Sequence, residues 1–356
     1  MFLYELKLTS SHRMKKVAVV ILNWNGEKLL NDFLPSVIQY TNYDWCEIVV
    51  ADNASNDGSL QLLKEKFTSV KVIKLASNFG FAKGYNEAMK WIDAEYTVLL
   101  NSDVEVTEGW LLPLLTYLDG HKNYAAVQPK ILAQKQKTYF EYAGAAGGYI
   151  DWLGYPFCRG RIFDVCETDV KQYEDIKNVF WTSGACMVIR TEVFKTLDGF
   201  DADFFAHMEE IDLCWRMHNS GFQLACIPLS AVYHVGGASL AQGHPQKVLL
   251  NFRNNLFMLF KNLPWMALFL IIPFRLFLDG IAALQFLVRG KFAAIVSVLS
   301  AHVQFYINLP KLIAKRKYIA QQKLGPAQGV YQHSLLVAHF FQGKNRFSDL
   351  AQAGFH

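Results

Sequence analysis

The sequence predicts an α/β protein with a mostly parallel sheet covered by helices on both faces. In its first part, short runs rich in β-branched residues alternate with segments that have helical spacing of apolar residues. The runs are apolar almost throughout, as is typical of strands buried on both faces of a parallel sheet. The strands are expected at residues 17–22, 47–51, 70–75 and 96–100, and the helices at 27–40, 58–67 and 81–93.

Residues 129–180 interrupt this alternation, because they are rich in Gly, Tyr and Trp and lack a repeated apolar pattern. We expect loops and irregular strands there, lying over the ligand-binding edge of the sheet. Regular elements return further along the chain. Strands are expected at 185–190, 223–227 and 231–234, and helices at 209–220 and 246–262.

The composition argues against several classes of protein. The chain has 356 residues and a net charge of +4, and its basic residues are scattered until the C-terminal third. Nucleic acid is therefore not an expected partner. The six cysteines form no Cys-x-x-Cys pair and no Cys/His ligand spacing, so we expect reduced thiols and neither a disulfide framework nor a zinc site.

The N-terminus has a short apolar start but no long apolar region and no cleavage site of a signal peptide. Met14 lies just before the first predicted strand and is an alternative start. We expect residues 1–13 to form an N-terminal extension and residues 14–240 to form the main domain.

Two apolar runs near the C-terminus, at 265–288 and 292–309, predict helices that contact a membrane. Their lengths are close to the roughly 20 apolar residues that a bilayer span requires. A spanning hairpin would carry Arg289 and Lys291 to the outer side, against the positive-inside tendency, so helices lying in the cytoplasmic interface are favoured. The alternative is a soluble helical cap through which the chain forms a homo-oligomer.

The same analysis divides the C-terminal part of the chain in two. We expect an amphipathic linker helix within residues 241–263 and a membrane-associated helical region over residues 264–356. Arg275 and Asp279 lie four residues apart and are expected to pair on one helix face.

Polar residues follow each predicted strand of the first half, where ligands of parallel sheets bind. They are Asn23, Asp52, Asn53, Asn78 and the triplet Asn101, Ser102 and Asp103. Asp52 can accept hydrogen bonds from a base edge or ribose hydroxyls, and Asn78 and Lys83 are candidates for nucleotide contacts. The glycines around Lys83 do not have P-loop spacing, and packing or a capped turn is the alternative for these segments.

Asp103 ends a buried strand and is the expected ligand of a divalent cation. Mg²⁺ or Mn²⁺ takes one or two carboxylates together with substrate phosphates, so a single aspartate and a diphosphate would suffice. His234, near the end of a short strand, is a second candidate ligand. A lone histidine at such a place is more often structural.

A third group of candidates lies at the start of an acidic helix. Glu209, Glu210 and Asp212 stand where the helix macrodipole favours anions, so simple capping would explain them. Glu210 and Asp212 lie on different helix faces, however. One can face a cleft as a general base while another pairs with Arg216.

Taken together, these segments resemble the family 2 glycosyltransferases of the GT-A fold, and most of all the rhamnosyltransferase-like bacterial branch. The resemblance runs from residue 17 to residue 237. It rests on Asn-Trp-Asn at 23–25, Asp-Asn-x-Ser-x-Asp-Gly-Ser at 52–59, Asn-x-Gly-Phe-Ala-x-Gly-x-Asn at 78–86, Leu-Asn-Ser-Asp at 100–103, Gly-Phe-Asp-x-x-Phe-Phe at 199–205, Glu-Glu-x-Asp-Leu-Cys-x-Arg at 209–216 and His234.

The resemblance implies a nucleotide-sugar-dependent, metal-assisted, inverting transferase. Asp103 would be the remaining carboxylate of the family's Asp-x-Asp motif, whose first position is Asn101 here. His234 falls where some members place a metal-ligating histidine. Glu210 falls where the family has its catalytic base, usually an aspartate, and Glu209 is the alternative base. Asn23, Asp52, Asn53, Asn78, Lys83 and Ser102 would contact the nucleotide sugar.

We therefore expect sugar transfer from a dTDP-, UDP- or GDP-linked donor to a glycan or lipid-linked acceptor, in surface polysaccharide assembly at the cytoplasmic face of the cell membrane. One alternative is a non-catalytic, membrane-tethered protein that binds nucleotide sugars. Another is a sugar nucleotidyltransferase. That reaction usually needs a basic, glycine-rich triphosphate loop near the first strand, and residues 23–27 do not form one.

Overall fold

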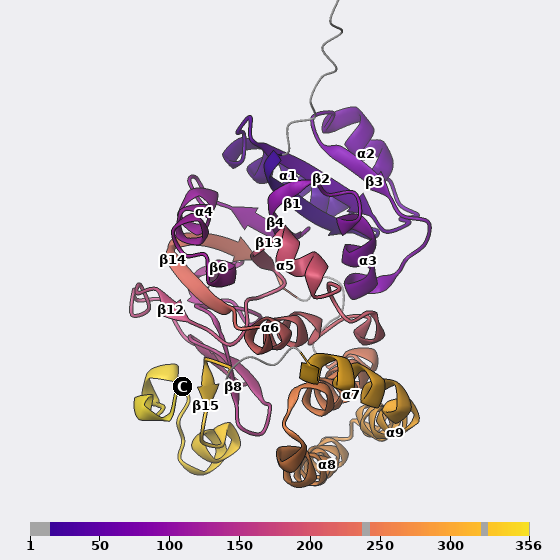
Figure 1. Cartoon of the computed structure of the whole chain (residues 1–356), viewed down its shortest axis with the longest axis vertical. Helices are drawn as coiled ribbons and strands as arrows, with labels where there is room; N and C mark the ends of the chain where they lie inside the picture. The colour runs from indigo at the N-terminus through magenta and orange to yellow at the C-terminus, as the bar shows by residue number, and fades with distance from the viewer. Residues whose placement is uncertain (1–14, 237–242, 322–326, 356) are drawn as a thin grey trace, which may run out of the picture.

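The computed structural model describes residues 15–236, 243–321 and 327–355. The expected N-terminal extension, Met14 and the boundary at residue 240 lie outside these residues. Figure 1 shows a central sheet, a smaller sheet around β8 and a group of C-terminal helices beside the small sheet at one end of the molecule.

The first half of the chain forms the parallel part of the central sheet, as predicted. Strands β1 (Lys15–Asn23), β2 (Cys46–Asp52), β3 (Lys71–Lys74) and β4 (Ala94–Asn101) lie in the order β4-β1-β2-β3. Leu22 lies opposite Asn101 on one side, and Asn23 lies opposite Asp52 on the other. The polar ends of β1, β2 and β4 are therefore neighbours at one edge.

Helices cover both faces of this sheet. The connections are α1 (Glu27–Tyr40), α2 (Ser59–Lys66) and α3 (Gly80–Met89). Val17 and Val19 of β1 belong to one buried cluster with Leu30 of α1, whereas Ala18 belongs to another with Tyr85 of α3. Successive side chains of a strand point to opposite faces, so this alternation confirms a sheet buried on both sides.

The second half of the central sheet mixes directions. Strand β13 (Cys186–Arg190) runs antiparallel to β4 and to β6 (Tyr124–Ala133), and β14 (Gln223–His234) runs parallel to β6. The two runs expected at 223–227 and 231–234 form this one strand, whose register shifts between Ile227 and Ala231. The remaining elements here are β5 (Val104–Val106), α4 (Leu111–Gly120), β7 (Gln136–Phe140), β12 (Lys177–Asn178) and α5 (Thr191–Thr196).

The irregular segment expected at 129–180 contributes most of a small second sheet. Its strands are β8 (Gly148–Asp151), β9 (Pro156–Cys158), β10 (Arg161–Ile162), β11 (Val165–Cys166) and β15 (Val330–Tyr331), in the order β11-β10-β9-β8-β15. Strand β15 comes from the C-terminus and pairs with β8. The buried carboxylate of Asp151 accepts the Leu335 N–H at 2.9 Å and so anchors this segment.

The C-terminal region is helical only in part. Helices α7 (Pro245–Asn262), α8 (Trp265–Val288) and α9 (Phe292–Gln321) agree with the expected linker helix and apolar runs. From residue 327 the chain turns back onto β8 and does not continue the helical region that the sequence suggested up to residue 356. It forms β15 and short turns at Val337–Phe341, Phe347–Asp349 and Gln352–Gly354.

Helices α8 and α9, of 24 and 30 residues, are long and apolar enough to cross a membrane by length and composition. Most of their surface is exposed. Arg275 and Asp279 pair on α8 at 3.7 Å, as predicted, and His302 of α9 joins Asp279 at 3.2 Å. Both charged residues of α8 are thus buried, whereas many of its large apolar side chains are exposed.

Candidate active site

The ends of β1 and β2 form a polar edge. Asn23 and Asp52 are both buried, and the Asn23 amide donates to Asp52 Oδ1 and to Ser55 Oγ, each at 3.2 Å. The Oδ1 atom of Asn23 has no hydrogen-bond partner among the described residues. It faces Gly26, where a Cβ would lie 2.3 Å from it and 3.9 Å from Ser102 Oγ. A side chain at residue 26 would therefore collide with the Asn23 amide, so the glycine lets Asn23 keep its position near Ser102.

The next loop is held by Asn53. Its side chain accepts the Phe79 N–H at 3.0 Å and donates to Asn78 Oδ1 and to the Gly80 carbonyl, both at 3.1 Å. These bonds use the side chain inside the protein, so the role that the structure shows for Asn53 is to fix the loop. Asn78 is exposed, and the Lys83 ammonium lies 4.6 Å from the Phe79 ring centroid.

The residues expected to hold a metal ion are in contact. Strands β5 and β14 pair antiparallel with Val104 opposite His234, which places the Asp103 carboxylate beside the imidazole. His234 Nε2 lies 3.1 Å from Asp103 Oδ1 and 3.3 Å from Asn101 Nδ2. The other ring nitrogen, Nδ1, lies 3.4 Å from Glu141 Oε1. Asp103, His234 and Glu141 are all buried.

These contacts change the pKa values of the pair. Burial alone would lower the pKa of His234, but the carboxylates of Glu141 and Asp103 outweigh it and raise this pKa to about 10. Burial would raise the pKa of Asp103, yet His234 holds it below its usual value. The surroundings of the Asp103–His234 pair therefore favour positive charge, which a proton or a cation can supply.

The donor set is suited to a divalent cation shared with a diphosphate. Asp103 offers a hard oxygen ligand and His234 an imidazole nitrogen, while Glu141 stands behind the imidazole as the carboxylate that orients such a ligand. Glu141 contacts the other ring nitrogen of His234 and so does not converge with Asp103 on the same point. Among the described residues, no three Asp, Glu, His or Cys side chains are grouped so that they could hold a metal ion. Other ligands would have to come from substrate and water.

Two glutamates begin α6 (Glu209–Asn219). Glu209 is 4% exposed, and the Oε2 atoms of both Glu209 and Glu210 are buried without a hydrogen-bond partner in the part of the chain that the structure describes. Burial raises the pKa of Glu210 to about 7. Burial and the neighbouring Glu210 raise the pKa of Glu209 well above its usual value. A carboxyl group whose pKa is raised close to 7 and which has a free oxygen atom has the properties of a general base.

Glu210 lies at the same edge of the sheet as Asp103. Its Cβ is 3.8 Å from the point where a Cβ on Gly184 would stand. The next residue, Ala185, accepts the Asn101 N–H at 3.0 Å through its carbonyl. Thus β13 begins between the acidic helix and the end of β4.

Asp212 and Arg216 confirm the predicted pairing within the acidic helix, since Arg216 Nε donates to Asp212 Oδ2 at 3.0 Å. Asp212 is fully buried and also accepts from Lys261 and Asn262 of α7, each at 2.9 Å. Of the three acidic residues, Asp212 is therefore the structural one.

Sequence reasoning missed Glu141. It follows β7 in an irregular segment, and its N–H bonds to the Ile131 carbonyl at 3.1 Å, which carries the residue toward β14. No local pattern marks it. An acidic residue directly after a strand was the one signal present in the sequence.

Solved structures of known proteins share this arrangement of the sheet. GalNAc-T7, solved with UDP, GalNAc and Mn²⁺, has a TM-score of 0.53 at 19% identity, covering 70% of this chain and 48% of that one. The mannosyltransferase PcManGT from Pyrobaculum calidifontis has a TM-score of 0.50 at 14% identity, covering 87% and 86%. The fold is therefore that of the GT-A glycosyltransferases.

Residues 18–198 match the model of Glycosyl transferase family 2, and the chain belongs to this family. It is 26% identical over 230 residues to the O-antigen biosynthesis protein RfbC of Myxococcus xanthus, covering 63% of this chain but only 18% of RfbC. It is 24% identical over 232 residues to N-acetylglucosaminyl-diphospho-decaprenol L-rhamnosyltransferase of Mycobacterium tuberculosis, covering 61% and 75%. The rhamnosyltransferase WbbL of Escherichia coli is 24% identical over 230 residues, with 61% and 83% covered.

Proposed function

We propose that this protein is an inverting, metal-dependent glycosyltransferase that uses a nucleotide-sugar donor. One observation carries the proposal. A single edge of the sheet combines a buried Asp103–His234 pair, suited to a cation and a diphosphate, with Glu210, whose Oε2 atom is buried and has no hydrogen-bond partner among the described residues. Leaving-group stabilisation and deprotonation of the acceptor are the two tasks of such a transfer.

The chain's own residues then have separate roles. Asn23, Asp52 and Ser102 hold the nucleoside part of the donor along the ends of β1, β2 and β4. Asp103 and His234 would hold Mg²⁺ or Mn²⁺, which when bound neutralises charge on the departing diphosphate. Glu210 takes the proton of the acceptor hydroxyl while the acceptor oxygen attacks the anomeric carbon. A single base without an enzyme nucleophile leads to inversion.

We also propose an acceptor class and a location. Helices α8 and α9 expose long apolar faces, and the M. tuberculosis relative is named for an acceptor linked through a diphosphate to decaprenol. A lipid-linked glycan acceptor at the cytoplasmic face of the membrane, in the assembly of a surface polysaccharide, agrees with both observations. We place the helices in the interface, because a spanning hairpin would carry Arg289 and Lys291 to the outer side.

The experiment is a donor screen with the purified full chain. dTDP-, UDP- and GDP-sugars are each incubated with lipid-linked and soluble glycan acceptors and Mn²⁺, and the released nucleoside diphosphate is measured. Release together with a glycosylated acceptor supports the proposal. Pyrophosphate would instead indicate a nucleotidyltransferase, and binding without release would indicate a scaffold protein.

Two matched variants assign the base. Glu210→Gln should lower turnover by about 10²–10⁴-fold, the usual cost of losing a general base, while nucleoside diphosphate still binds. Glu209→Gln removes a neighbouring buried carboxylate and should retain more activity. Near-normal transfer by Glu210→Gln with loss in Glu209→Gln would move the role to Glu209.

A further inference from the structure

A strained loop precedes the proposed catalytic base. It connects the short helix Ala202–Phe204 to α6, and Phe205, His207 and Met208 all have φ between 63° and 70°. Phe205 has φ 63° and ψ −59°, and the Ala206 N–H donates to the Phe204 carbonyl at 2.7 Å. This is a γ-turn of the strained kind, which persists only where the surroundings hold it.

One side of the loop is fixed by α3. The carbonyl of Phe205 accepts the N–H groups of Phe81 and Ala82 at 2.9 and 3.1 Å. The Phe205 ring also covers Gly80, where a Cβ would come within 2.5 Å of it. This side of the loop therefore meets the part of the fold that follows β3.

The other side is fixed by one buried amide of α7. The Nδ2 atom of Asn254 donates to the carbonyls of Phe204, Ala206 and His207, at 3.0, 2.9 and 2.7 Å. Asn254 is fully buried. Its neighbour Arg253 adds bonds from Nη2 to the carbonyls of Asp203 and Phe204, at 3.0 and 3.1 Å. These carbonyl groups thus accept hydrogen bonds from side chains of α7.

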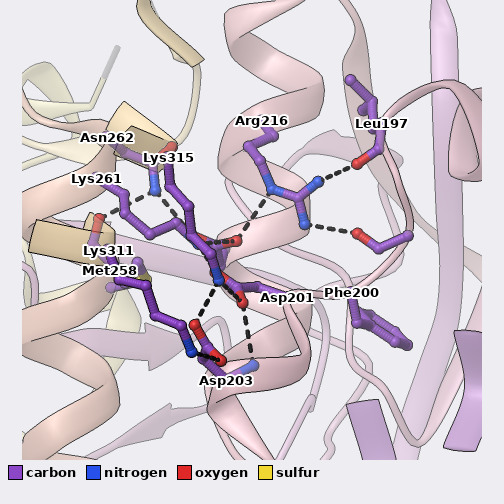
Figure 2. Close-up of polar contacts among 12 residues, drawn as sticks. Leu197, Phe200, Asp201, Asp203, Arg216, Met258, Lys261, Asn262, Lys311 and Lys315 are labelled. Carbon is purple, nitrogen blue, oxygen red and sulfur yellow. Dashed lines mark hydrogen bonds and ion pairs between the residues drawn. The ribbon is translucent and has the colours of Figure 1, made fainter. Parts of the chain in front are cut away.

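Charged groups brace both ends of the loop (Figure 2). Before it, Asp201 accepts from Lys261 at 2.5 Å and also from Lys315, and Asp203 accepts from Lys311 and Lys315 at 2.9 and 2.7 Å. After it, Lys261 also reaches Asp212 on α6. Helices α7 and α9 therefore hold the loop from Asp201 to α6 as one unit.

We propose that Asn254 is a positioning residue for the transfer reaction: by tying the three carbonyls of the strained loop, it directs the carboxylate of Glu210 toward the acceptor. The inference rests on the proposed function, in which Glu210 is the base. Like Glu210 and His234, Asn254 lies outside residues 18–198, which match the family model.

The test compares two adjacent asparagines in the full chain. Asn255 is also buried and donates to one carbonyl, that of Gly154, at 2.7 Å, in the turn between β8 and β9. Asn254→Ala and Asn255→Ala each remove a buried amide from α7, but only the first touches the loop. For each variant we would measure the melting temperature, kcat, the donor KM and the pH dependence of kcat.

Asn254→Ala should lower kcat by at least about tenfold with little change in donor KM, because no hydrogen bond among the described residues joins the loop to Asn23, Asp52 or Ser102, which hold the donor in the proposed function. The acid limb of its pH profile should move to lower pH, since a displaced Glu210 is less buried. Asn255→Ala should match it in stability but keep kcat within about twofold and leave the profile unchanged.

Equal kcat in the two asparagine variants, or an unmoved pH profile in Asn254→Ala, would overturn the proposal. If Asn254→Ala does not fold, Arg253→Gln provides the test instead, because Arg253 is more exposed than Asn254. Arg253→Gln should lower kcat and move the acid limb of the pH profile in the same direction as Asn254→Ala, but by less. An unchanged kcat and pH profile would overturn the proposal. Glu210→Gln separates the two hypotheses. If it stays active, the assigned base is wrong; if it is inactive while Asn254→Ala is fully active, only the positioning role is wrong.

Discussion

His234 Nε2 lies 3.1 Å from Asp103 Oδ1, although the two residues are far apart in the sequence. The contact exists because β5 and β14 pair with Val104 opposite His234. Glu141 approaches the other ring nitrogen, so the imidazole lies between two carboxylates. A histidine held in this way presents one nitrogen to the site with a defined orientation.

The first prediction concerns the metal dependence of donor binding. Asp103→Ala removes the proposed oxygen ligand, so UDP, GDP or dTDP should bind with the same reduced affinity whether or not Mn²⁺ is present. Titration calorimetry with and without the metal measures this directly. Asp57→Ala is a suitable control, because its carboxylate caps a turn at the backbone of Glu27 and Ser59. A Mn²⁺ effect that survived in Asp103→Ala would reject the ligand role.

The second prediction concerns Glu141, which contacts His234, a proposed metal ligand, and would not itself contact the cation. Glu141→Gln should weaken Mn²⁺ affinity by about 10–100-fold, the usual effect of losing such an orienting carboxylate. The affinity for the nucleotide in the absence of metal should stay unchanged. Mn²⁺ binding followed by electron paramagnetic resonance provides the measurement, and an unaltered affinity would show that Glu141 serves only to charge His234.

Much of this site could be predicted from strand ends. Asn23, Asp52 and Asp103 each follow an apolar run, and parallel strands place their carboxyl ends together. The pairing of His234 with Asp103 needed more, because it depends on the three-residue strand β5, which is too short to show a period. The position of His234 near a strand end made it a candidate ligand, and the family resemblance strengthened that interpretation.

Other features had no sequence signal. The two residues of β15 join β8 because Asp151, buried in another part of the chain, accepts a backbone N–H from Leu335. The loop before α6 uses positive φ at three of four successive non-glycine positions, Phe205, His207 and Met208, and Phe and Met rarely adopt that conformation. Both features are imposed by tertiary contacts, which local propensity does not encode.

The third prediction is a pH dependence. A general base acts only when ionised, and burial raises the pKa of Glu210 to about 7. The value of kcat/KM should therefore be full above this pKa and fall by about tenfold per pH unit below it. The residual activity of Glu210→Gln should lack this acid limb. A wild-type profile that remained flat from about pH 5.5 to 8 would contradict Glu210 as the base.

The fourth prediction concerns the stability of the charge network that includes α6. Asp212 is fully buried between Arg216, Lys261 and Asn262. Asp212→Ala leaves two buried cations without this partner and should cost about 3–5 kcal/mol of unfolding free energy. Thermal melts in mild detergent would show it as a drop of several degrees. Glu87→Ala, which breaks an ion pair with the exposed Lys90, should melt close to the wild type.

The last prediction tests how the apolar helices meet the membrane. Phe269 and Phe277 of α8 are 71% and 63% exposed, and transferring one such side chain from water to an apolar phase is worth about 1.5–3 kcal/mol. Replacing both with serine should therefore weaken binding to anionic vesicles by more than tenfold in a sedimentation assay. Leu229→Ser, which changes an exposed apolar residue on β14, is the control.

Helices lying in the interface would be released from vesicles by alkaline carbonate, whereas spanning helices would stay in the pellet and would tolerate both serines. Resistance to extraction would thus replace the interfacial arrangement with a spanning hairpin.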